Sequence, residues 1–266
     1  MDKPVSGSRT PQQGGFTLIE IAIVIIIIGL ILGGVLKGQE LIRTARTHSV
    51  ADQGSAVRAA IMGFADRYRA LPGDYDNASA NIPGVESGQD GDGNGRVGYN
   101  DSKTPGKPDE ANRLLEPSLA WLHLAKAGFI SGAFDGKPLR PGDLSGWGCP
   151  PESCMMNAFN APMFFIYANE QTGVTWASDT ARSNQLWVGK NIPVELIAEL
   201  DRKMDDGNPS TGHFRAGDGF VEGAPALVGT ACATGGKLPT KDHPEGSPFQ
   251  WDIKGQAIDC GAVLLF

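Results

Sequence analysis

The strongest constraint on this chain of 266 residues is an almost uninterrupted apolar segment near its N-terminus. The segment runs from Phe16 to Leu36, and Glu20 is its only charged residue. A helix of that length spans roughly 30 Å, which matches the hydrocarbon core of a bilayer. A carboxylate at that depth costs about 3 kcal/mol, and no cation lies one helical turn from Glu20. We therefore expect a membrane-spanning helix whose carboxylate finds its partner elsewhere, the nearest candidate being an amine created by cleavage after Gly15.

The residues at the start of this segment resemble a known motif. Gly14-Gly15-Phe16 is followed by Thr-Leu-Ile-Glu and then by the apolar run. This order resembles the prepilin motif of type IV pilins and type II secretion pseudopilins. The resemblance implies that a prepilin peptidase cleaves after Gly15 and N-methylates Phe16. It also implies that Glu20 pairs with the N-terminal amine of an adjacent subunit during filament assembly.

An ordinary signal peptide or a generic single-pass anchor is the alternative interpretation of the segment. A signal peptide has a shorter apolar core followed by a small-x-small cleavage site. The residues that follow here, Val35-Leu36-Lys37-Gly38-Gln39, contain no Ala-x-Ala sequence. A generic anchor requires neither Glu20 nor a Gly-Gly-Phe junction. The pattern therefore favours a prepilin.

The helix is expected to continue beyond the membrane. No proline occurs between Leu36 and Pro72, and apolar residues recur at steps of three, four and seven, which places them on one helix face. Leu71-Pro72-Gly73 then ends the helix. The pattern predicts a helix from Phe16 to about Ala70, embedded in the membrane at first and then amphipathic. The apolar stripe of its second half consists of Val50, Val57, Ile61, Phe64, Tyr68 and Leu71.

We divide the chain into a cleaved leader (1–15), a transmembrane or filament-core helix (16–36), its amphipathic continuation (37–72) and a globular body (73–266). The 36 glycines and 18 prolines indicate a loop-rich body. The predicted fold class is α+β, with the long helix packed on short antiparallel strands and additional helices. Helices are expected at Glu110–Ala127 and Pro193–Met204, and strands at Met163–Ala168, Val174–Ala177, Gln185–Val188, Ala226–Ala231 and Ala257–Phe266.

All four cysteines follow the apolar segment, and their even number suggests disulfides in an oxidising compartment. Three connectivities are possible, and free buried thiols are the alternative. We favour Cys149–Cys154 with Cys232–Cys260, because this pairing closes two local loops. Together with the resemblance, the cysteines place the body in the periplasm. A net charge of −7 argues against a nucleic-acid partner.

The segment Asp90-x-Asp92-x-Asn94-Gly95-Arg96 matches the first half of a calcium-binding loop. Alternate oxygen-bearing side chains point inward in such a loop, and the glycine permits its sharp turn. The resemblance to pilins and pseudopilins also implies calcium as a recurring ligand of the body. The alternative is a solvated cluster of Gly and Asp turns, and both interpretations remain open. The predicted ligands are Asp90, Asp92, Asn94, the backbone carbonyl of Arg96, and Asp101.

Other polar groups suggest no chemistry. Asp201, Asp205 and Asp206 are interpreted as a helix end followed by a turn. The four histidines are dispersed, and the sequence has no nucleophile elbow, zinc-protease motif or phosphate-binding glycine loop. No catalytic residue is predicted.

The sequence thus predicts a non-enzymatic minor pilin or pseudopilin of a type IV pilus or type II secretion-like filament. Its expected partners are prepilin peptidase, other pilin or pseudopilin subunits, an inner-membrane assembly platform and inner-membrane lipid. It is expected in the inner membrane as a single-pass protein, and in a filament or at the cell surface after assembly. A calcium-dependent adhesin or binding module displayed on such a filament is the alternative, and a membrane-tethered enzyme is a third possibility.

Overall fold

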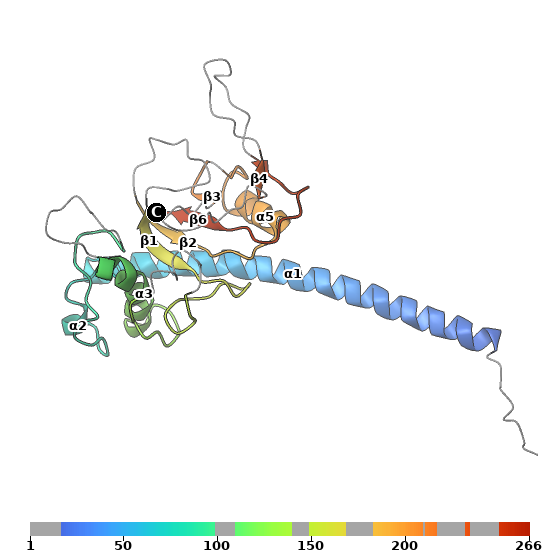
Figure 1. Ribbon diagram of the computed structural model, residues 1–266, viewed down its shortest axis with the longest axis horizontal. Helices are drawn as coiled ribbons and strands as arrows, with labels where there is room; N and C mark the ends of the chain where they lie inside the picture. The colour runs from blue at the N-terminus through green and yellow to red at the C-terminus, as the bar shows by residue number, and fades with distance from the viewer. Residues whose placement is uncertain are drawn as a thin grey trace, which may run out of the picture. The chain divides into compact units, whose positions relative to one another are not determined.

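The computed structural model describes residues 17–98, 110–139, 149–168, 183–209, 211–216, 232–234 and 250–266 (Figure 1). The chain forms two compact units, Met1–Thr44 and Ala45–Phe266. Helix α1 (Leu18–Tyr68, 51 residues) contributes to both of them. The predicted long helix is therefore present, and its ends lie within two residues of the expected ones.

The first unit contains the apolar part of α1. This helix is long and apolar enough to cross a membrane, and none of its most apolar 18-residue window is buried. Large aliphatic side chains such as Ile26, Leu30 and Leu36 are more than 60% exposed. These side chains would be stable in lipid or against other apolar helices, because each buried one removes a large apolar surface from water.

In the second unit, α1 is amphipathic and forms one wall of the core. Val50, Val57, Ile61 and Phe64 of the predicted stripe are at most 2% exposed, and Tyr68 packs against them. The approach of α1 to the sheet is close, because a Cβ atom added at Gly54 would lie 3.1 Å from Cδ1 of Leu264. The spacing of the stripe therefore determines which face of α1 the body covers.

The main sheet has four antiparallel strands in the order β1-β2-β6-β3. Phe165 of β1 pairs with Leu186 of β2, which in turn pairs with Leu264 of β6. These three side chains share one face of the sheet, and Leu264 on that face meets α1. The strands are β1 (Phe164–Ala168), β2 (Ser183–Trp187), β3 (Phe214–Ala216) and β6 (Ala262–Leu265), and a separate two-stranded sheet pairs β4 (Ala233–Thr234) with β5 (Gln250–Trp251).

The predicted strands differ from the observed ones at the C-terminus. Only Ala262–Leu265 of the predicted strand Ala257–Phe266 joins the sheet. The preceding residues make other contacts, because Cys260 forms an isolated bridge with Ile192 and the carbonyl of Ala257 accepts a hydrogen bond from the N–H of Val194. The predicted strands Val174–Ala177 and Ala226–Ala231 lie outside the described residues.

Three further helices complete the described part of the body. α3 (Glu110–Lys126) corresponds to the predicted second helix, and α2 (Ala78–Asn81) is a single turn that was not predicted. α5 (Val194–Met204) begins one residue later than expected, because Pro193 is its N-cap. α5 buries Ile197 and Leu200.

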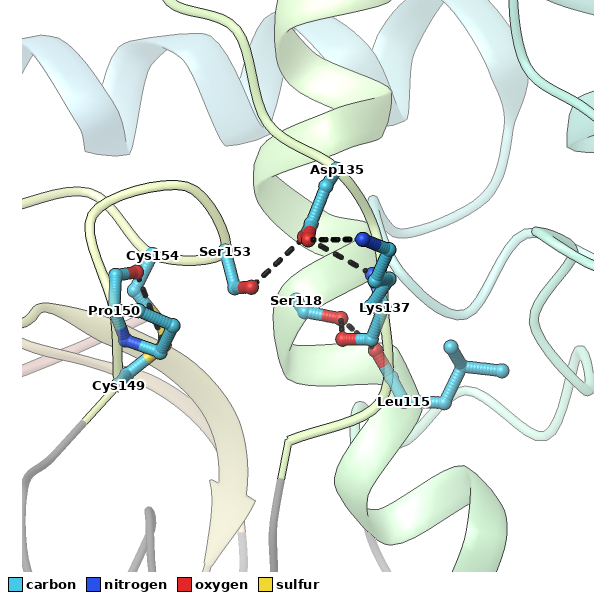
Figure 2. The surroundings of a disulfide bond; sticks show 8 residues. All are labelled: Leu115, Ser118, Asp135, Lys137, Cys149, Pro150, Ser153 and Cys154. Atoms are coloured by element: carbon cyan, nitrogen blue, oxygen red, sulfur yellow. Dashed lines mark hydrogen bonds and ion pairs between the residues drawn. A yellow bond between two sulfur atoms is a disulfide. The ribbon is translucent and has the colours of Figure 1, made fainter.

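Two disulfides stabilise the body, Cys149–Cys154 and Cys232–Cys260, which is the pairing that the sequence favoured. Figure 2 shows the first of them, beside which the Ser153 hydroxyl donates to Oδ1 of Asp135 at 2.8 Å. The N–H of Asp135 also donates to the carbonyl of Glu152 at 2.8 Å. The small disulfide loop is thus held to the segment that follows α3.

The two disulfides should contribute unequally to stability. Cys232 and Cys260 are 28 positions apart in the sequence, whereas Cys149 and Cys154 are 5 positions apart. A disulfide that closes a longer loop removes more entropy from the unfolded chain. We expect the double variant Cys232→Ser/Cys260→Ser to lose about 3.5 kcal/mol and Cys149→Ser/Cys154→Ser about 2 kcal/mol of unfolding free energy. Guanidinium unfolding of the detergent-solubilised chain, followed by tryptophan fluorescence, measures both. The opposite order would contradict this account.

Candidate metal centre and N-terminal motif

Glu20 lies in the first turn of α1 and has partners within its own chain. The N–H and the hydroxyl of Thr17 donate to Oε2 of Glu20 at 2.9 and 2.8 Å, and the N–H of Glu20 donates to Oγ1 of Thr17 at 3.3 Å. This reciprocal arrangement is a capping box. These hydrogen bonds supply no positive charge, so the amine expected as the cationic partner of Glu20 stays a prediction. Gly15 and Phe16 lie outside the described residues.

Three carboxylates from separate parts of the chain meet in the body. Asp74 follows the turn that ends α1, Asp92 lies in the Asp-Gly loop, and Glu116 projects from α3. One oxygen of each lies within 4.8 Å of the others. Asp74 is 3% exposed and Glu116 is fully buried, whereas Asp92 is exposed. We call these three residues the acidic cluster.

Backbone N–H groups of the segment 92–98 surround the two buried carboxylates. Their donation to Asp74 and Glu116 offsets part of the cost of removing these groups from water. The donors to Asp74 are Asn94 and Gly95, each at 2.9 Å, and the donors to Glu116 are Asp92 at 3.2 Å and Gly98 at 2.6 Å. The loop therefore folds around the carboxylates instead of extending into solvent.

The ionised forms of Glu116 and Asp74 are disfavoured in the acidic cluster. Burial, together with the neighbouring charges of Asp92 and Asp74, raises the pKa of Glu116 to about 8 against the opposing hydrogen bond from the N–H of Gly98. Burial likewise raises the pKa of Asp74 to about 6, with a further contribution from Asp92. Like charges at short range and loss of hydration both disfavour the ionised forms. A cation bound between these oxygens would offset both penalties.

The side chains of the calcium ligands predicted from the sequence do not all point toward the acidic cluster. The carboxylate of Asp90 accepts hydrogen bonds from the N–H and the hydroxyl of Ser79, at 2.7 and 2.8 Å. The side-chain amide of Asn94 donates to Oδ2 of Asp92 at 2.8 Å. Of the predicted ligands, Asp92 is the one that belongs to the acidic cluster. Asp101 lies outside the described residues, and the guanidinium of Arg96 lies 5.3 Å from the centre of the Tyr167 ring.

Sequence reasoning missed Asp74 and Glu116 as members of the cluster. A signal for Glu116 was present, because it shares a helix face with Leu119, Ala120 and His123, all of which are buried. A carboxylate on an apolar face requires a partner. Nothing in the linear sequence indicated which partner, since Asp74 and Asp92 are separated from Glu116 by a long stretch of chain.

The second acidic group, Asp201, Asp205 and Asp206, is engaged in local hydrogen bonds. The indole N–H of Trp251 donates to the buried Asp201 at 2.7 Å, and burial raises the pKa of Asp201 to about 6. Asp205 accepts from the N–H groups of His213 and Phe214, and Asp206 accepts from the N–H of Asn208 and the hydroxyl of Thr211. These bonds agree with the interpretation of a helix end followed by a turn.

A hollow of about 330 Å³ lies elsewhere on the body, between α1 and the sheet. Phe165, Tyr167 and Phe266 supply its aromatic walls, and both polar groups of the Asn184 side chain are already hydrogen bonded to backbone. No carboxylate, histidine or cysteine side chain among the described residues lines this hollow. It is separate from the acidic cluster.

Comparison with known proteins identifies one part of the chain. Residues 10–36 match the family model described as the prokaryotic N-terminal methylation motif. No curated protein and no solved structure matches the chain. The matched range contains Gly15, Phe16 and Glu20, which supports a prepilin motif of the type IV pilin and pseudopilin kind at the N-terminus.

Proposed function

We propose that this chain is the precursor of a minor pilin or pseudopilin, a non-enzymatic structural subunit of a type IV pilus or type II secretion-like filament. The observation that carries the proposal is the methylation motif at residues 10–36, which continues without a break into an apolar, unburied helix. Prepilin peptidase cleaves after Gly15 and methylates Phe16. The mature protein is then anchored in the inner membrane by α1.

Assembly follows from the same helix. The apolar part of α1 exposes its side chains, so neighbouring helices can replace lipid around it. The capping box orients the Glu20 carboxylate at the first turn, where the amine of an adjacent subunit's Phe16 would neutralise it. An inner-membrane assembly platform and the other subunits are the partners in this step. The two disulfides favour a periplasmic body, because disulfides persist in oxidising compartments.

We further propose that the acidic cluster binds calcium. Calcium is a hard cation that takes oxygen ligands, and Asp74, Asp92 and Glu116 bring three carboxylates together. Two of them are buried with raised pKa values, which a bound dication would lower again. This site favours a calcium-dependent binding module or adhesin on the filament as the second candidate function.

Processing should be directly visible in the mature protein. Because the motif places cleavage between Gly15 and Phe16, residues 1–15 should be absent and the N-terminus should be N-methyl-Phe16. Mass spectrometry of the membrane-extracted protein measures this, and a Gly15→Leu variant that retains its leader provides the control. A mature chain that starts at Met1, or beyond Gly34, would refute the prepilin interpretation.

Two substitutions at Glu20 separate its charge from its capping role. Glu20→Ala removes both, whereas Glu20→Gln keeps an oxygen that can accept from Thr17 but has no charge. Both variants should insert into the membrane, because the cost of the carboxylate disappears. Both should assemble poorly, because a neighbouring buried amine that loses its partner costs on the order of 3–5 kcal/mol. Cross-linking of sheared filaments measures incorporation, and wild-type incorporation of Glu20→Gln would show that only the cap matters.

Calcium should stabilise the body through the acidic cluster. Calcium at 100 times its Kd adds about 2.7 kcal/mol, which raises the Tm of a body of this size by several degrees. Glu116→Gln should abolish this gain, whereas Asp90→Asn should retain it, because Asp90 binds Ser79 instead of the cluster. Thermal melting of the detergent-solubilised chain with calcium and with chelator measures both variants.

The stabilisation of the body by calcium should depend on pH. Because the pKa values of Glu116 and Asp74 are raised in the folded state, to about 8 and about 6, the contribution of these groups to stability without calcium falls as the pH rises from about 4.5 to about 8. Calcium must displace those protons, so its gain in Tm should be larger at pH 8.5 than at pH 5.5. Overlapping melting curves with calcium and with chelator at both pH values would rule out the calcium site.

A further inference from the structure

His123 is a fully buried histidine that makes two hydrogen bonds to backbone. Its Nδ1 accepts from the N–H of Gly73 at 3.0 Å, so this nitrogen carries no proton. Its Nε2 therefore carries the proton and donates to the carbonyl of Gln89 at 2.8 Å. The ring also stacks on Phe64 of α1, with 6.2 Å between centroids and 10° between planes. Position, tautomer and ring orientation are all determined by contacts.

The two backbone partners of His123 belong to the two loops of the acidic cluster. Gly73 immediately precedes Asp74, and Gln89 lies three residues before Asp92. His123 itself follows Glu116 by seven residues on α3, two helical turns along the same face. One imidazole ring therefore connects the helix that carries Glu116 to both segments that carry the other carboxylates.

The segments joined in this way are already in close contact with each other. The N–H of Gly93 donates to the carbonyl of Asp74 at 2.8 Å, and that of Gly91 to the carbonyl of Tyr75 at 2.9 Å. A Cβ atom added at Gly91 would lie 2.3 Å from the carbonyl carbon of Asp74. The backbone segments around Asp74 and Asp92 are thus held together, and we call them the paired segments. Their position relative to Glu116 then depends on the contacts that the paired segments make with α3.

Among the described residues, the hydrogen bonds that join these segments to α3 include two kinds, one through the Glu116 carboxylate and one through His123. The N–H groups of Asp92 and Gly98 donate to the carboxylate oxygens of Glu116, which are the atoms that a cation would bind. The bonds of His123 use no carboxylate oxygen. The two bonds of His123 therefore hold the paired segments against α3 whether or not a cation is bound to the acidic cluster.

We propose that His123 is the positioning residue of the calcium site, holding the Asp74 and Asp92 segments at the distance from Glu116 at which one cation contacts all three carboxylates. This inference rests on the proposed calcium site. His123 does not bind the cation. It acts by keeping three ligands from separate segments preorganised, as hydrogen-bonded residues behind metal ligands do elsewhere.

The test is calcium affinity, measured by isothermal titration of the full chain in detergent micelles. His123→Phe keeps a ring for Phe64 but removes both hydrogen bonds, so the Kd for calcium should rise about tenfold or more. His123→Asn keeps an acceptor for Gly73, and His123→Gln keeps a donor for Gln89. Each should give a Kd between those of the wild type and His123→Phe. Leu200→Ala, in the buried face of α5, destabilises the core away from the cluster and should keep the wild-type Kd.

The outcomes separate the inference from the calcium proposal. A wild type that binds calcium together with a His123→Phe variant that binds equally tightly would overturn the role of His123 and leave the site intact. An equal loss of affinity in Leu200→Ala would also overturn it, because general loosening would then explain the effect. If His123→Phe does not fold, wild-type affinity in both the Asn and Gln variants decides against the proposal. A wild type that takes up no calcium overturns the site and this inference together.

Discussion

The described body is organised around the buried stripe on the second half of α1. Phe64 shows how much depends on one position of this stripe, because its ring contacts Tyr68, Tyr75, Phe129 and His123 from different segments of the chain. The sheet meets the same helix at Gly54, where the absence of a side chain lets Leu264 approach. Helix, sheet and α3 therefore share one apolar core. Polar substitutions in the stripe would therefore destabilise the packing of α1 against both α3 and the sheet, since burial of such side chains is the main favourable term in folding.

Carboxylates in both units are held by hydrogen bonds from backbone N–H groups. Glu20 is hydrogen bonded to Thr17, and Asp74 and Glu116 are hydrogen bonded to the amides of the segment 92–98. Hydrogen bonds satisfy the oxygen lone pairs, but they do not supply an opposite charge. The pKa values of Asp74 and Glu116 are raised because the hydrogen bonds from these amides only partly compensate for the loss of hydration. An arriving cation would complete each site, an amine for Glu20 and a metal ion for the cluster.

The sequence predicts the long helix well, because periodicity and the absence of proline are local properties. The same reasoning finds α3 and α5, whose apolar residues recur at helical spacing. It overestimates β6, because Ala257 and Cys260 have the apolar character of a strand but bond to Val194 and Ile192 near α5. Pairing partners are tertiary information, and strand propensity alone does not contain them.

The acidic cluster shows the same limit more sharply. A linear motif proposed alternate residues of one loop, yet Asp90 turns to Ser79 while Asp92 meets carboxylates from the α1 turn and from α3. The side chains of a short Asp-Gly loop are free to bond to whichever donors lie nearby, so spacing alone does not determine their direction. Glu116 and His123 were detectable as polar residues on a buried helix face. Such residues persist in a core only where partners satisfy them, so they indicate a tertiary contact whose other members the structure must supply.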